Sequence, residues 1–138
     1  MDITLALIAD AANVSADGKL NIMGVFNALG ATTFPVVHPQ IAMVLRFEAN
    51  RAEEGKTRKI EIALSDIDGA KLFAIGADLV VPAAPPGTPI RLNHILMLNN
   101  LQFPKAGDYV FNVLIGDDHK AAIDLRLIEV KQEIRPVA

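Results

Sequence analysis

Apolar residues recur at every second position along most of this sequence, and this alternation constrains the fold more than any other feature. A β-strand directs successive side chains to opposite faces, so a period of two predicts strands that place one face in a core. Glycine, proline, asparagine and aspartate stand where the alternation breaks, which is typical of turns between strands. The sequence therefore predicts an all-β protein in which helices are scarce or absent.

We expect about eight strands, most of them joined by short turns. The clearest alternation places four apolar side chains of residues 40–49 on one face: Ile41, Met43, Leu45 and Phe47. The expected strands span residues 2–10, 19–29, 40–49, 59–64, 71–81, 90–103, 108–115 and 121–127. Strand 2–10 has a second, partly apolar face at Ile8, and Ile128 with Val130 indicates a change of phase after the last strand.

The breaks between these strands have recognisable chemistry. The Asp-Gly pairs at 17–18 and 68–69 predict hairpin turns, and Gly24 within strand 19–29 predicts a bulge or a close approach of two backbones. Two Pro dipeptides, at 34–35 and 38–39, are expected to bracket a loop that contains His38. The mixed charges of 51–59 predict a solvated loop, and the four prolines of the Pro82 to Pro89 segment predict a semi-rigid crossover loop.

Two packed sheets are the natural arrangement for antiparallel strands of this kind, because each sheet has one face that must be covered. We therefore predict a single β-sandwich domain over residues 1–138, with a flattened β-barrel as the alternative. Residues 103–115 combine Phe-Pro, Gly-Asp-Tyr and an alternating strand, a pattern that resembles the late strands of immunoglobulin-like sandwiches. A chain of this length buries enough surface to fold without disulfides or a structural metal.

Composition excludes several classes of function. The formal charge of -3 provides no broad basic surface for binding nucleic acid. The absence of cysteine excludes disulfides, thiol nucleophiles and Cys-based zinc sites, and is compatible with the cytoplasm. No apolar run approaches the ~20 residues that a membrane helix needs. Because Asp2 and Asp10 flank the first apolar run and Lys19 is the first basic residue, we expect no signal peptide.

No catalytic, cofactor-binding or metal-binding constellation is visible. His38, His94 and His119 are far apart in the sequence, without the short spacing that metal ligands on one element need. Ser15 and Ser65 lie beside turns and lack the glycine elbow of a hydrolase nucleophile. We therefore expect no catalytic residues, no metal and no cofactor, and a protein that is not an enzyme.

Polar residues within strand 90–103 offer the one candidate pocket. His94 has the parity of Leu92 and Leu96, so its imidazole is expected to face apolar neighbours. With Asn93 and the Pro82 to Pro89 loop, it would border a small polar pocket. The simpler interpretation is that these side chains are structural, with their hydrogen bonds satisfied inside the fold.

Three stretches together resemble an uncharacterised bacterial family, a domain of unknown function with a small all-β fold. The first comprises Asp-Ala-Ala-Asn-Val-Ser at 10–15 and Gly-Lys-Leu-Asn-Ile-Met-Gly-Val-Phe at 18–26. The second is formed by the Phe-Pro and His-Pro pairs at 34–35 and 38–39, and the third runs from Asn93 through Phe-Pro at 103–104 to Gly-Asp-Tyr at 107–109. The resemblance implies a small bacterial, cytoplasmic protein, and it supplies no activity and no functional residues.

Two functional hypotheses follow. Strand 90–103 has apolar side chains on both faces, and Ile95, Met97 and Leu101 are expected to form a surface through which the protein self-associates. This hypothesis describes a structural or protein-interaction module, a homo-oligomer that also has room for an unidentified protein partner. The alternative is a small-molecule-binding sandwich with its pocket at Asn93 and His94.

Overall fold

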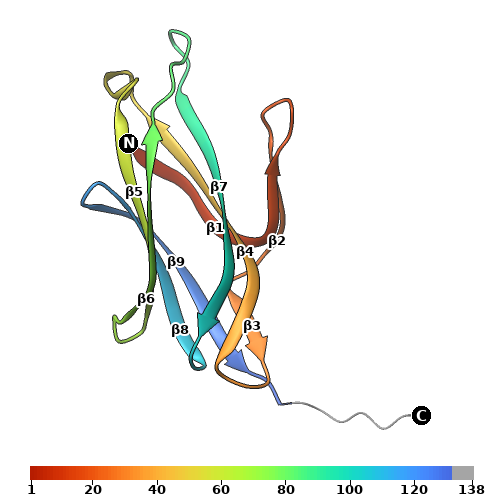
Figure 1. Cartoon of the computed structure of the whole chain (residues 1–138). Helices are drawn as coiled ribbons and strands as arrows, with labels where there is room; N and C mark the ends of the chain where they lie inside the picture. The colour runs from red at the N-terminus through yellow and green to blue at the C-terminus, as the bar shows by residue number, and fades with distance from the viewer. Residues whose placement is uncertain (132–138) are drawn as a thin grey trace.

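Two facing sheets make up the fold in the computed structural model, which describes residues 1–131 (Figure 1). The strand order of sheet A is β2 (Leu20–Val25), β1 (Asp2–Val14), β4 (Val36–Ala49) and β7 (Ile90–Phe103). The order of sheet B is β3 (Ala28–Ala31), β9 (Asp118–Glu129), β8 (Gly107–Ile115), β5 (Thr57–Asp66) and β6 (Lys71–Val80). The prediction of an all-β, two-sheet protein is confirmed, and the predicted domain end at residue 138 lies outside the described residues.

The two sheets differ in their pairing. Sheet A is antiparallel throughout, whereas sheet B is mixed because β3 pairs in parallel with β9, and sheet B curls like half of a barrel. The fold thus combines the predicted sandwich with one feature of the flattened-barrel alternative. Immunoglobulin-like topology stays a prediction. One local feature agrees with it: the Tyr109 hydroxyl donates a hydrogen bond of 2.6 Å to the Lys105 carbonyl, as in a tyrosine corner.

The core lies between the sheets and follows the predicted alternation. The four residues predicted to point inward on β4, from Ile41 to Phe47, are all buried, and they meet Ile60, Ile62 and Leu64 of β5 in one cluster. Phe103 and Phe111 add fully buried rings from β7 and β8. Each such side chain stabilises the fold by roughly 1.5–3 kcal/mol through removal of apolar surface from water.

The predicted strand 19–29 is wrong, because the chain changes sheets within it. Gly24 adopts a φ of 73° and lies so close to β1 that a Cβ atom there would be 2.4 Å from Asp10 Oδ2. The atoms that approach Gly24 belong to the Asp10 side chain, where a bulge or a close approach of two backbones was predicted. Beyond it, Arg126 of β9 donates its backbone N–H to the Asn27 carbonyl, and β3 begins in sheet B.

The segment around His38 is also extended, where a loop was predicted. β4 begins at Val36, and His38 pairs with Leu101 of β7 in the same register that joins Gln40 to Asn99. Between these two pairs, both strands exchange the faces to which their odd and even residues point. Asn100, which has a φ of 54°, lies at this position of β7. A left-handed residue rotates the side chains that follow it, so the alternation does not carry through.

This change of phase overturns the prediction for Leu101. Instead of sharing an outer face with Ile95 and Met97, Leu101 is 5% exposed and belongs to the core together with Phe103. The faces of β1 also differ from expectation. A register shift between Ile3 and Leu5 places Ile8 in the core, so Ile8 is not part of a second exposed face.

The mixed-charge segment 51–59 is not a solvated loop. It forms a short 3-10 helix, η1 (Arg51–Glu53), followed by the start of β5 at Thr57. Glu53 is 5% exposed, and its carboxylate accepts hydrogen bonds from Arg58 and from the Met1 ammonium group. Partners from distant parts of the chain make this burial feasible.

Most of the remaining boundaries agree with the sequence. β7 has the predicted bounds, the Pro82 to Pro89 loop crosses from sheet B to sheet A, and both Asp-Gly hairpins are present. His119 falls between the predicted strands 108–115 and 121–127 but lies in β9, paired with Leu114. The predicted change of phase near Ile128 is wrong, because Leu127 still faces the core and Ile128 is exposed.

Candidate functional site

The outer face of sheet A, away from the core, is apolar across all four strands. Pairing aligns Val25 of β2, Ala9 of β1, Ala42 of β4 and Met97 of β7 in one row across the sheet. The neighbouring row aligns Leu7, Val44 and Ile95. We call these seven residues the outer patch: Leu7, Ala9, Val25, Ala42, Val44, Ile95 and Met97.

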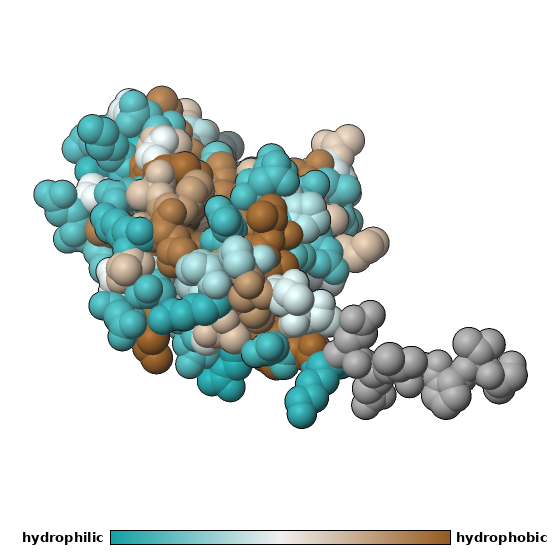
Figure 2. Space-filling model, turned by 60° about the horizontal axis from the view of Figure 1, so that its bottom comes forward, coloured by the Kyte–Doolittle hydropathy of each residue, from teal (hydrophilic) through white to brown (hydrophobic). Residues whose placement is uncertain are grey.

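Pleating explains why these residues lie on the outer face. Residues next to each other along a strand point to opposite faces, and Met43 and Leu45 of β4 belong to the core cluster. Ala42 and Val44 therefore face outward, where they form a buried floor. Val25 and Met97 stand at the two ends of the row, 61% and 38% exposed. Figure 2 shows, for the side of the molecule in view, that apolar side chains reach the surface in patches among hydrophilic ones.

A polar rim borders the outer patch along the strands. Arg46 Nε donates a hydrogen bond of 2.9 Å to Asn93 Oδ1, and Arg91 Nε donates one of 3.1 Å to Glu48 Oε1. At the opposite border, Gln40 pairs with Asn99. Glu48 and Arg91 thus neutralise each other, whereas Arg46 keeps its positive charge, because its partner Asn93 is neutral. An apolar centre with a polar border is the usual anatomy of a protein–protein interface.

The structure brings together only part of the predicted self-association face. Ile95 and Met97 lie in the outer patch, whereas Leu101 is in the core. The sequence analysis did not find the outer-patch residues of β1 and β4. For β4, the sequence does contain an indication: the run from Ile41 to Leu45 is apolar at every position, so both faces of this strand are apolar.

The predicted pocket also divides between the two faces of sheet A. Asn93 lies on the outer face, where it contacts Arg46. His94 points inward, as predicted, and lines a cavity of about 100 Å³ between β6 and β7. The Pro82 to Pro89 loop does not line this cavity. Arg51 of η1 instead donates hydrogen bonds to the carbonyls of Ala84 and Pro85.

The cavity beside His94 is apolar, where a polar pocket was predicted. Its walls are aliphatic and aromatic side chains from both sheets: Phe47, Ile60, Ile62, Ile75, Leu79 and Leu96. Its volume is smaller than the cavity of about 150 Å³ that accommodates benzene in a protein interior. The space fits one apolar side chain or a molecule of that size.

The histidines do not form a common site. The three histidines lie on three strands, β4, β7 and β9, and His119 contacts Asn112 at 2.8 Å. Across residues 1–131, no three metal-ligating side chains form a cluster. Within the same residues, no helix is long and apolar enough to cross a membrane.

Among residues 1–131, Glu53 is the carboxyl group whose pKa is strongly shifted. The Met1 ammonium group, 2.9 Å from Glu53 Oε2, is the main cause that lowers the pKa from its ordinary value of 4.5 to about 2. Burial opposes this shift, while the Asn50 backbone N–H and the Arg58 guanidinium reinforce it. These contacts join the first residue to η1 and β5, so Glu53 has a structural role.

The fold and the outer patch define a small two-sheet β domain with an apolar outer face on sheet A. The model of a family of unknown function, DUF6941, matches residues 4–128, and the chain belongs to this family. This confirms the resemblance to a domain of unknown function. No curated protein matches the chain.

Proposed function

We propose that this domain is a non-catalytic protein-interaction module that self-associates through the outer patch. The observation that carries the proposal is the row from Val25 to Met97, an apolar line across the full width of sheet A. Val25 and Met97, at the two ends of the row, are exposed to water, and exposed apolar surface carries a free-energy cost. Packing against another sheet removes that cost.

A second copy of the chain is the partner that best suits this face. The rim charges of Glu48 and Arg91 pair with each other and Arg46 is hydrogen-bonded to Asn93, so most of the polar border is already satisfied inside the chain. Two identical apolar sheets can pack face to face about a two-fold axis, with the sheets about 10 Å apart. The cytoplasmic location and bacterial origin implied by the family resemblance are part of the same proposal, as is function without a cofactor.

Charge substitutions in the outer patch test this proposal. Met97→Glu and Val25→Glu each place a carboxylate in the apolar row, at positions that are exposed in the single chain and so tolerate the change. We expect the wild-type protein to have the mass of a dimer by light scattering, and both variants the mass of one chain. Ile67→Glu is the matched control, because Ile67 is 72% exposed in the β5–β6 turn, outside the patch. A monomeric wild type, or a dimer that both patch variants leave intact, would contradict the proposal.

The small-molecule alternative has one supporting observation, the apolar cavity beside His94. Ligand pockets usually have volumes of about 300–1,000 Å³ and several convergent polar groups. The cavity here is smaller, and His94 and Asp78 are the polar residues among its apolar lining. The geometry therefore supports self-association better than binding of a metabolite. Methyl chemical shifts of Ile62 and Leu79 that stay unchanged across a metabolite set would count against the alternative.

A further inference from the structure

Strand β6 is the outermost strand of sheet B, and it offers a long open backbone edge. It pairs with β5 from Val80 back to Lys71, and no other strand of residues 1–131 pairs with its far side. Such an edge presents a row of backbone N–H and C=O groups that can pair with another chain. Figure 1 shows β6 beside β5, at the end of sheet B.

The usual protections of an edge strand are weak on β6. The other edge strands are short, as β2 and β3 are, or interrupted, as β7 is by the left-handed Asn100. β6 has ten residues, and from Leu72 to Ala77 it contains no charge and no proline. Natural proteins normally protect long edges with such residues. Their absence indicates that this edge is kept available for pairing.

The inner side of this edge leads to the apolar cavity. Ile75 and Leu79 of β6 line it from sheet B, and His94 and Leu96 of β7 line it from sheet A. β7 is itself the edge of sheet A, so the cavity lies between the two open edges of the sandwich. A strand added beside β6 would point every second side chain toward this space. The volume of about 100 Å³ suits one aliphatic side chain.

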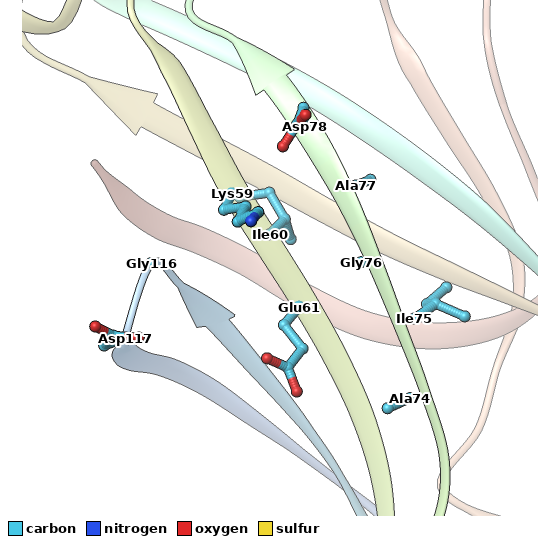
Figure 3. A pocket seen from close by; sticks show the side chains of 10 residues that line it. All are labelled: Lys59, Ile60, Glu61, Ala74, Ile75, Gly76, Ala77, Asp78, Gly116 and Asp117. Atoms are coloured by element: carbon cyan, nitrogen blue, oxygen red, sulfur yellow. The ribbon is translucent and has the colours of Figure 1, made fainter.

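The outer side of the same edge is hollowed and acidic. The hollow has a volume of about 860 Å³, and its floor is low because Ala74 and Gly76 have little or no side chain (Figure 3). Around it stand three carboxylates, Glu61, Asp78 and Asp117, and one ammonium group, Lys59. Lys71 contacts Glu61 at 3.6 Å, whereas Asp78 and Asp117 have no ion-pair partner among residues 1–131.

We propose that β6 binds an extended segment of a partner protein in which apolar and basic side chains alternate. The segment adds to sheet B as a further antiparallel or parallel strand. One apolar side chain enters the cavity beside His94, and the basic side chains on the other face lie near Asp78 and Asp117. This site is separate from the outer patch, which lies on the other sheet, so either proposal can fail without the other.

A synthetic peptide of seven residues, alternating Lys with Val or Leu, tests the proposal. We expect a fluorescently labelled form to bind the full-length protein, and the backbone amide signals of β6 to shift in NMR spectra. The same peptide with Glu in place of Lys should bind about tenfold or more weakly, because like charges then face each other. The proposal is overturned if the Lys peptide does not bind, if the Glu peptide binds equally well, or if the shifts lie elsewhere.

A substitution on the edge provides the matched test on the protein side. Gly76→Lys is sterically allowed, because a Cβ there would be 3.7 Å from the Ile60 carbonyl oxygen, an ordinary contact. It places a positive charge at the hollow, and we expect it to weaken binding of the Lys peptide by about tenfold or more. Ala122→Lys adds the same charge to an exposed position of β9, which β8 and β5 separate from β6. We expect this variant to bind the Lys peptide with an affinity within about twofold of wild type.

The occupant is distinguished in the same experiment. The mass of the protein without peptide is measured as well. If Gly76→Lys lowers this mass from that of an oligomer to that of one chain, a second copy of the chain occupies the edge, and the proposal of a partner segment is overturned. Equal weakening by Gly76→Lys and Ala122→Lys would show a non-specific charge effect and would also overturn the proposal.

Discussion

Glu53 should stabilise this fold in a pH-dependent way, and Glu53→Gln is the perturbation that measures it. Glu53 Oε2 accepts hydrogen bonds of 2.9 Å from the Met1 ammonium group and from Arg58 Nη2. Glu53 Oε1 accepts a longer one, 3.3 Å, from the Asn50 backbone N–H. The substitution keeps the shape of the side chain and removes its charge.

The magnitude follows from the pKa of Glu53. A decrease from 4.5 to about 2 corresponds to about 3 kcal/mol of preference for the charged form in the folded protein. Arg58 is 38% exposed, so solvent screens part of this interaction, and we expect about 2 kcal/mol. Because the folded-state pKa is lowered, the stabilisation is complete above pH 4.5 and is lost as the pH falls from about 4.5 to about 2.

Urea denaturation of untagged protein at several pH values checks this expectation. At pH 7, Glu53→Gln should lower the free energy of unfolding by about 2 kcal/mol, and near pH 2 the difference from wild type should disappear. Glu54→Gln is the control: its carboxylate lies 4.0 Å from Arg51 and is more exposed, so we expect a change of about 0.5 kcal/mol or less. An equal loss at pH 7 and pH 2 would refute the reasoning, as would no loss at pH 7.

Two further predictions concern single residues that define the shape of the sandwich. Asn100→Val should lower the free energy of unfolding by about 1–2 kcal/mol, because a β-branched residue tolerates the φ of 54° poorly. Asn100→Gly should leave the free energy of unfolding unchanged or raise it. Equal losses in both variants, measured by urea denaturation, would contradict this prediction. Tyr109→Phe should cost about 1 kcal/mol through loss of the hydrogen bond to the Lys105 carbonyl. A Tyr109→Phe protein as stable as wild type would show that this bond adds nothing net.

The strands that sequence predicted well are those whose alternation is uninterrupted. From Ile41 to Phe47 of β4, every second side chain points into the core, and the bounds of β7 follow from prolines and a Phe-Pro pair at its ends. Local chemistry suffices in these cases, because each strand is bounded by residues that cannot continue it. The same holds for the Asp-Gly hairpin turns.

The failures arise where a contact between distant residues decides the structure. The chain leaves sheet A at Gly24 because Asp10 of another strand lies against it, and Glu53 is buried because Met1 and Arg58 meet it. None of these three partners is adjacent in the sequence. The left-handed Asn100 likewise reverses the faces of β7, which is why counting by twos assigned Leu101 to the surface.

The candidate site contains residues that alternation along one strand predicts and residues that only the pairing of distant strands brings together. Ile95 and Met97 could be predicted from one strand, because their parity differs from that of the core residues Leu96 and Leu98. Leu7 and Val25 could not, because only the pairing of β1 and β2 with β4 shows that they share a face with Met97. A surface made by several strands depends on strand order, which alternation does not contain.

The central claim is that the outer patch is buried between two copies of the chain. Isotope-filtered NOE spectroscopy on a mixture of labelled and unlabelled protein tests it most directly, since it detects only contacts between copies. The account predicts intermolecular NOEs among the methyl groups of Val25, Ile95 and Met97, and their loss in Met97→Glu. Intermolecular NOEs that arise from β6 instead, or none in a protein that sediments as a single chain, would contradict it.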